Sequence, residues 1–157
     1  MVKVEKLTKG PKLITPKRTI TETDIVNFVC LVGLFEPPFI DMEHVRNSTG
    51  MGKRFAPAPL LISIAMGLTS LAFVNPDKEW LDAWNAQGKF GGMVGIEAKL
   101  MHPTWPGDTL YVEVEIAESK TTSNGGRLIH LKHTLKNQRG EIPLEFIERV
   151  FFLPPES

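Results

Sequence analysis

The amino-acid sequence predicts an α+β domain in which an antiparallel sheet wraps around a long buried helix. The first half of the chain holds one apolar stretch of helical length, residues 57–73. The second half, from about Val94, alternates between apolar and polar residues, and turn-forming sequences divide it into segments. Helices followed by a run of long strands are typical of an α+β domain, because the sheet has to cover the apolar helix.

Length and composition indicate the class of protein. The chain has 157 residues, of which 42% are hydrophobic, so it can form one domain with its own core. Its 18 Lys and Arg residues balance its 18 Asp and Glu residues, so no net field attracts a nucleic acid or an anionic membrane. The first twenty residues contain no export signal, and no apolar run is long enough to span a membrane. We therefore expect a cytoplasmic protein.

The single cysteine and the four histidines show no pattern of metal ligands. Cys30 excludes an internal disulfide and a cysteine-rich metal site, and its apolar neighbours predict that it is buried. His130 and His133 are an odd number of positions apart in a predicted strand, so their side chains point to opposite faces. His44 is expected to be exposed, and His102 stands at the end of a strand. We expect neither a metal nor a cofactor.

The N-terminal segment is predicted to be a lead-in to the domain. Residues 1–17 alternate only weakly between apolar and polar residues and contain Gly10, Pro11 and Pro16. Glycine and proline at this frequency favour an irregular or edge-strand segment. We place the domain itself at residues 18–157.

A first helix is predicted between Thr21 and Gly33. Thr21 is a suitable N-cap, and Asp24 stands three positions later, where an acidic side chain can bond back to the cap. Gly33 is a suitable stop. The apolar residues between them repeat at helical spacing, at Ile25, Phe28, Val29 and Val32.

The residues after this helix predict a loop and a second, longer helix. Pro37 and Pro38 remove two hydrogen-bond donors, so we expect residues 34–41 to form a rigid loop, followed by a short helical turn from Asp41. Residues 57–73 are apolar on nearly every face and therefore predict a helix buried on most sides. Ser63 within it lacks the surroundings of a nucleophile and is expected to bond back to the helix.

The last third of the chain predicts a meander of strands. Residues 110–116 and 128–135 alternate with a period of two, and residues 144–152 form a last strand. A sheet of this kind around one helix is a hot-dog arrangement. Its free edges invite pairing with a second chain, so we expect a dimer. An aromatic and methionine-rich stretch before the strands suits either core or dimer packing or the wall of an acyl pocket: Trp80, Trp84, Phe90 and Met93.

Four segments, in this order, resemble the MaoC-like dehydratase family, which includes the (R)-specific enoyl-CoA hydratases. They are Ile20–Phe28, Leu31–Asp41, Phe55–Ser63 and Pro103–Leu110. The order and spacing of the segments are more specific than any one of them. The resemblance implies a hot-dog fold, an acyl-CoA or acyl-carrier thioester as substrate, and hydratase or dehydratase activity.

The same resemblance implies that the usual catalytic pair is replaced. In that family the loop after the first helix reads G-D-x-N-P-x-H-x-D, in which the Asp and the His are catalytic. Gly33, Pro37 and Asp41 match this pattern, whereas Leu34 and Phe39 stand at the two catalytic positions. Neither of these apolar side chains can transfer a proton.

A second family motif, His-Gly before the apolar helix, becomes Pro57-Ala58 in this chain. The Gly amide of that motif resembles an oxyanion donor, and Ala58 still offers an N–H at a helix start. We predict Ala58 and Glu36 as catalytic residues, since apolar neighbours of Glu36 would raise the pKa of its carboxyl. Asp41, more often a helix cap, completes the predicted binding set with Leu34, Phe39, Pro57 and Pro59.

Three functions remain open. The first is an acyl-thioester hydratase or dehydratase with a non-standard acid and base. The second is a non-catalytic thioester-binding subunit, paired with a related hot-dog chain that carries a complete catalytic pair. As the assembly we expect either a homodimer or a heterodimer with such a related chain. The third, an acyl-CoA thioesterase, is a minor alternative, because such enzymes commonly place an acid on the central helix and residues 57–73 contain none.

Overall fold

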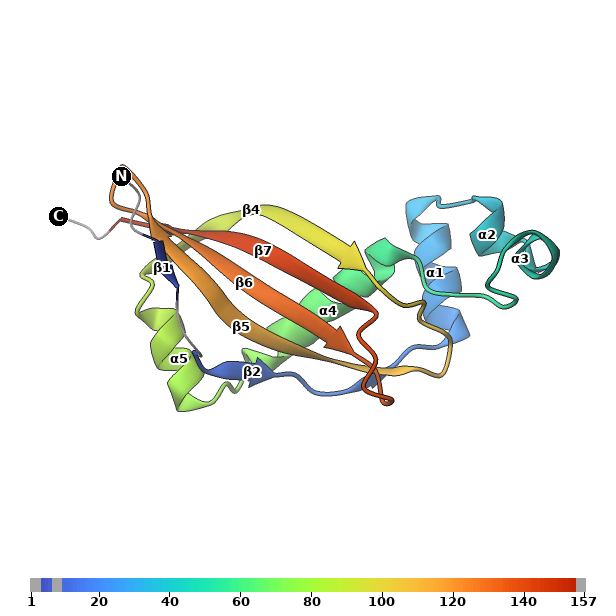
Figure 1. Ribbon diagram of the computed structural model, residues 1–157, viewed down its shortest axis with the longest axis horizontal. Helices are drawn as coiled ribbons and strands as arrows, with labels where there is room; N and C mark the ends of the chain where they lie inside the picture. Colours follow the sequence, from blue (N-terminus) through green and yellow to red (C-terminus); the bar gives the residue numbers. More distant parts are fainter. Residues whose placement is uncertain (1–3, 7–9, 155–157) are drawn as a thin grey trace.

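The protein is described by a computed structural model, which covers residues 4–6 and 10–154. Seven strands form one antiparallel sheet that curves around helix α4 (Figure 1). The strand order is β1-β5-β6-β7-β4, and β2 and β3 also pair with β5. The helices are α1 (Glu22–Val32), α2 (Pro37–Ile40), α3 (Met42–Ser48), α4 (Ala58–Ala72) and α5 (Lys78–Asn85). The strands are β1 (Val4–Lys6), β2 (Lys12–Ile14), β3 (Arg18–Thr19), β4 (Lys89–Leu100), β5 (Thr109–Thr121), β6 (Arg127–Lys136) and β7 (Leu144–Leu153).

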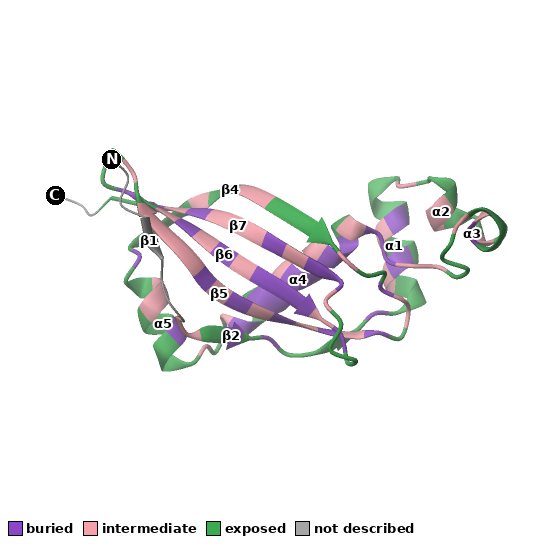
Figure 2. Cartoon of the chain, viewed as in Figure 1, coloured by how far each residue is buried: buried purple, intermediate pink, exposed green. Residues whose placement is uncertain are grey.

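This architecture confirms the predicted α+β fold with a sheet wrapped around one long helix. Buried residues gather on α4 and on the central strands β5, β6 and β7, while β4 and the helices α1 to α3 are largely exposed (Figure 2). The sheet-facing side of α4 is apolar apart from Thr69. Its buried residues are Leu60, Leu61, Ile64, Ala65, Leu68, Thr69 and Ala72.

Helix α4 is exposed along one side. Pro59, Ser63, Gly67 and Ser70 form an exposed stripe at helical spacing along the side away from the core. The other sides of α4 are buried or partly buried, which agrees with the prediction of a helix buried on most sides, and Leu71 is the one large apolar residue exposed beside this stripe. The Ser63 hydroxyl donates a hydrogen bond of 2.8 Å to the carbonyl of Pro59, as expected for a serine on a helix.

Helix α1 has the predicted start and end. The Thr21 hydroxyl accepts a hydrogen bond from the Asp24 N–H, and the Asp24 carboxylate accepts one from the Thr21 N–H. Gly33 ends the helix in the left-handed conformation, with a φ of 70° that glycine adopts without strain. The prediction for Cys30 is wrong: it is exposed, because α1 is covered only on the side of Ile25 and Val29.

The two prolines open a helix instead of preventing one. The rigid loop expected over residues 34–41 contains the short helix α2, in which Pro37 and Pro38 occupy the first turn. An N–H in the first turn has no partner within the helix, so proline is tolerated there. The predicted helical turn after Asp41 is confirmed as α3.

The first long strand and the lead-in also differ from the sequence expectation. Strand β4 begins at Lys89, before Val94, so Phe90 and Met93 lie in the strand. Within the lead-in, β1 and β2 pair with β5. In the described part of the chain β4 pairs only with β7, and its exposed apolar residues are Phe90, Met93, Val94 and Leu100. No helix among the described residues is long and apolar enough to cross a membrane.

Candidate active site at the start of the central helix

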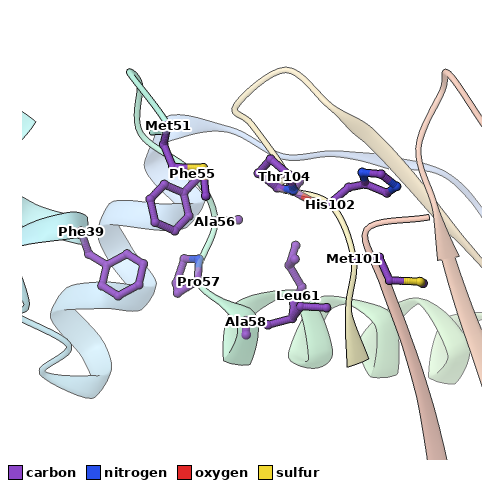
Figure 3. A pocket seen from close by; sticks show the side chains of 12 residues that line it. Phe39, Met51, Phe55, Ala56, Pro57, Ala58, Leu61, Met101, His102 and Thr104 are labelled. Atoms are coloured by element: carbon purple, nitrogen blue, oxygen red, sulfur yellow. The ribbon is translucent and has the colours of Figure 1, made fainter. Parts of the chain in front are cut away.

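A cavity of about 370 Å³ lies beside the first turn of α4 (Figure 3). Three parts of the chain enclose it: helix α2, the segment that leads into α4, and the segment between β4 and β5. The lining is mostly apolar and consists of Phe39, Met51, Phe55, Ala56, Pro57, Ala58, Leu61, Leu100, Met101, His102, Pro103 and Thr104. Such a concave, largely apolar site with few polar groups is typical of small-molecule binding.

Backbone hydrogen bonds hold the walls of the cavity together. The Ala56 N–H donates a bond of 2.9 Å to the carbonyl of Thr104, which joins the segment before α4 to the segment after β4. The Arg54 side chain donates to the carbonyl of Phe39 and forms an ion pair with Glu22 of α1. The ring centroids of Phe39 and Phe55 are 5.4 Å apart. Segments distant in sequence are thereby fixed around one space.

The N–H of Ala58 is the backbone donor at the start of α4. Pro57 is the N-cap and offers no side-chain cap, and within the described residues the Ala58 N–H has no hydrogen-bond partner. The next residue is Pro59, which has no N–H. The positive end of the helix dipole coincides with this unused donor. Ala58 can therefore donate to an oxygen on which negative charge develops.

Thr104 supplies a second polar group, which the sequence reasoning missed. It is fully buried, and its hydroxyl oxygen has no hydrogen-bond partner in the described structure. A buried hydroxyl without a partner is destabilising, so a hydroxyl of this kind at a cavity wall indicates a place for a ligand or water oxygen. Thr104 lies within the segment Pro103–Leu110 of the family resemblance, which was the available signal.

His102 is the one residue of the lining with an ionisable side chain. It is exposed and lies at the end of β4, as its position in the sequence suggested. Figure 3 places it on the same side of the cavity as Met101 and Thr104. The described residues contain no group of His, Cys, Asp and Glu that could hold a metal ion.

The structure brings three of the seven predicted site residues to this cavity, namely Phe39, Pro57 and Ala58. Leu34 is partly buried and packs against the core outside the lining. Pro59 is exposed on α4. Asp41 caps α3, since its carboxylate accepts bonds of 2.9 Å and 3.0 Å from the N–H groups of Glu43 and His44.

The surroundings of Glu36 differ from the apolar setting expected for it. The residue is exposed, stands at the N-cap of α2 without a side-chain hydrogen bond, and is absent from the cavity lining. No contact in the described structure connects it to Ala58. Its catalytic role stays a prediction.

Asp108 fixes the segment that carries Thr104. Its buried carboxylate accepts bonds of 2.9 Å from the Trp105 N–H, 2.7 Å from Arg139 and 3.2 Å from Gln138. Burial by itself raises the pKa of the Asp108 carboxyl. The hydrogen bonds from Arg139, Trp105 and Gln138, together with the charge of Arg139, outweigh burial and lower this pKa below its ordinary value of 3.8.

We expect the contribution of Asp108 to stability to depend on pH. Because its folded-state pKa is depressed, the contribution is complete above the unfolded-state pKa and is lost as the pH falls through the lower folded-state value. Asp108→Asn should lower the free energy of unfolding by about 1–3 kcal/mol at pH 6. Urea unfolding from pH 6 to pH 2 measures this, and the difference from the wild type should shrink below about pH 4. A constant difference would exclude the ionised carboxylate as its source.

Comparisons with known proteins identify the family of the chain. The family model described as FAS1-like, dehydratase domain region, matches residues 8–144. The protein MaoC of Klebsiella aerogenes is 33% identical over 112 residues, which are 70% of this chain. The chain spans only 29% of the length of that relative.

Solved structures show the same fold. The monoamine oxidase regulatory protein of Archaeoglobus fulgidus is 28% identical, with a TM-score of 0.79, over 96% of this chain and 93% of that one. The (R)-hydratase PhaJ1 of Pseudomonas aeruginosa is 20% identical, with a TM-score of 0.61, over 99% of this chain and 90% of that one. A chain of the HadBC (3R-hydroxyacyl-ACP dehydratase) complex of Mycobacterium tuberculosis is 17% identical, with a TM-score of 0.66, over 92% of this chain and 98% of that one.

Proposed function

Because the chain belongs to the MaoC-like hot-dog dehydratase family, we propose that it binds an acyl thioester at the start of α4 and acts on it as a hydratase or dehydratase. The observation that carries this proposal is the unused N–H of Ala58 beside a largely apolar cavity. The family motif has a glycine N–H at the same position. An apolar acyl group and a polarisable carbonyl are the ligand parts that suit these surroundings.

Hydration of an enoyl thioester places negative charge on the thioester oxygen as water adds to the β carbon. A donor aimed at that oxygen stabilises the enolate-like transition state. In our proposal the Ala58 N–H is this donor, and the helix dipole of α4 strengthens it. Phe39 and Pro57 form the apolar wall on which the acyl part lies.

Proton transfer needs a second set of groups. The family resemblance puts Leu34 and Phe39 at the positions of the usual catalytic pair, and neither can carry a proton. We propose that His102 exchanges the proton and that the buried Thr104 hydroxyl holds the reacting water. Glu36, the acid predicted from the sequence, is the competing assignment.

An assay with crotonyl-CoA and 2-octenoyl-CoA, followed by the absorbance of the conjugated thioester, tests the proposal. His102→Gln and Thr104→Val should each lower kcat/KM by about a hundredfold, the usual effect of losing an acid–base group, and Glu36→Gln should leave it unchanged. His44→Gln is a matched control, because this histidine does not line the cavity. Full activity in His102→Gln with loss in Glu36→Gln would assign the chemistry to Glu36. Release of free CoA, detected with a thiol reagent, would indicate a thioesterase.

A non-catalytic subunit is the second candidate. The apolar residues at the Leu34 and Phe39 positions support it. So does the outer edge of β4, which pairs with no other strand among residues 4–6 and 10–154 and suits a second hot-dog chain. HadBC is by its name a complex of dehydratase chains. This candidate predicts that the isolated protein binds crotonyl-CoA without turnover, and an active isolated homodimer would exclude it. The partner is then a hot-dog chain that carries a complete Asp and His pair.

A further inference from the structure

A second cavity, of about 400 Å³, lies at the opposite end of α4. Its lining begins on α4 at Met66 and Thr69, whereas the first cavity is lined by Ala58. Ala58 and Thr69 are eleven positions apart, which corresponds to about 16 Å along the helix axis. The nearest α4 residues of the two linings, Leu61 and Met66, are five positions apart. The two cavities share no lining residue, so the second is a separate site.

Aromatic side chains form the apolar part of this cavity. Phe73 at the C-cap of α4, Trp84 of α5 and Phe90 of β4 all line it. The rings of Phe73 and Trp84 are 5.1 Å apart at a steep angle, so they present surfaces of different orientation. Of the aromatic and methionine-rich stretch in the sequence, Trp80 belongs to the core, and Trp84 and Phe90 face this cavity.

The cavity has one acid, Glu148, at a position of the sheet that is otherwise apolar. Its neighbours at alternate positions on β7 are Phe146 and Val150, both buried. On β6 the corresponding series contains His133, whose side chain is fully buried. Burial of two ionisable groups against a core is unfavourable unless hydrogen bonds compensate. Apolar residues at the positions of His133 and Glu148 would satisfy packing alone. The presence of two polar residues there therefore needs a further reason.

The contacts of His133 define the charge of this pair. Its Nδ1 is 3.4 Å from the Thr69 hydroxyl oxygen, and that hydroxyl donates its own proton to the carbonyl of Ala65. With that proton engaged, the hydroxyl oxygen offers Nδ1 a lone pair, so we assign a proton to Nδ1. The other ring nitrogen, Nε2, is 3.0 Å from Oε2 of Glu148. One proton lies between Nε2 and Oε2, so the pair is uncharged overall whichever atom holds it.

The second carboxyl oxygen of Glu148 is unused. It has no hydrogen-bond partner among the described residues, and the side chain, 14% exposed, lines the cavity. Stacking of His133 on Phe146, with ring centroids 4.2 Å apart, fixes the ring that orients Glu148. The cavity therefore has aromatic walls, two hydroxyl groups from Thr69 and Ser70, and one carboxyl acceptor that belongs to a pair without net charge.

We propose that this second cavity binds an uncharged, mainly aromatic or alicyclic molecule that donates one hydroxyl hydrogen bond to Glu148. A ligand carboxylate would place its lone pairs against those of Glu148, and a cation would find no net counter-charge in the pair. The aromatic walls bind the ring system, and the acceptor selects the hydroxyl.

Three probes of one shape test the proposal on the wild-type protein in its native oligomeric state. They are 2-naphthol, 2-methoxynaphthalene and 2-naphthoate, and the readout is the shift of the Trp84 indole N–H in nuclear magnetic resonance titrations. We expect 2-naphthol to bind and to shift this signal. The two probes without an uncharged hydroxyl should bind at least about tenfold more weakly, the usual loss when a buried hydrogen bond is not formed.

Variants locate the acceptor. Glu148→Leu should remove the preference for 2-naphthol, while Glu145→Leu, an acid on the same strand that pairs with Lys132, should retain it. Equal binding of 2-naphthol and 2-methoxynaphthalene by the wild type would overturn the proposal even if Glu148→Leu failed to fold. The proposal would also be overturned if 2-naphthol did not bind, or if the shifts were confined to the indole signal of Trp105 near the first cavity. Thioester turnover is not part of the readout, so the result is independent of the proposed function.

Discussion

Ala58→Pro is expected to lower kcat for enoyl thioester hydration by a factor of about 10² to 10³ while leaving the fold intact. That range is the effect of removing one oxyanion donor from an enzyme that depends on it. Proline differs from alanine at this position chiefly by lacking the N–H that we assign to the thioester oxygen. The substitution therefore tests the donor with little change in the shape of the cavity.

The local structure permits this substitution. Ala58 is the first residue of α4, where proline is well accommodated, and Pro57 before it has the extended conformation, with a ψ of 148°, that a residue preceding proline prefers. Stability should stay the same or rise slightly. Ala58→Gly is the matched control, because it changes the same position and keeps its N–H.

Steady-state kinetics with crotonyl-CoA measure the loss of catalysis, and thermal unfolding measures any change in stability. Loss of kcat at an unchanged melting temperature supports the Ala58 N–H as the catalytic donor. Unchanged kcat in a folded Ala58→Pro variant would remove this donor from the mechanism. Binding of a saturated acyl-CoA should weaken much less than kcat falls, since the ground-state oxygen carries less charge than the transition state.

Trp80→Ala is expected to lower the free energy of unfolding by about 3–5 kcal/mol, the usual range for a large aromatic side chain removed from a core. Trp80 is fully buried and is the only buried residue of α5. Its ring contacts that of Phe73 at the end of α4, with centroids 6.0 Å apart. The substitution therefore leaves a cavity at the point where α5 joins the core.

Chemical denaturation of Trp80→Ala measures this loss, and Leu81→Ala is the control. Leu81 is the next residue of the same helix and is 39% exposed, so its truncation should have a much smaller effect. Trp80→Phe should retain most of the stability, because the buried indole N–H of Trp80 has no hydrogen-bond partner in the described structure to lose. A loss below about 1 kcal/mol in Trp80→Ala would show that α5 contributes little to the core.

Local signals in the sequence were sufficient for much of the secondary structure. The capping box of Thr21 and Asp24 and the stop at Gly33 depend on residues within one or two turns, and both are present in the structure. The alternation in β5 and β6 was equally direct, since every second side chain must face the same side of a sheet. The two prolines were misread because their effect depends on whether they stand inside a helix or in its first turn.

The sequence by itself determined the α+β fold, the helix around which the sheet wraps, and the family to which the motifs point. Only the tertiary structure decided which polar groups meet at the cavities. Thr104 and Ala58 are brought together because the N–H of Ala56 bonds to the carbonyl of Thr104 across 48 positions of the chain. Glu36 is the N-cap of α2, three positions before the cavity residue Phe39, and yet it is exposed and does not line the cavity. His133 and Glu148 meet on adjacent strands by their register. Periodicity assigns a side chain to a face, but it cannot tell which distant side chain lies opposite.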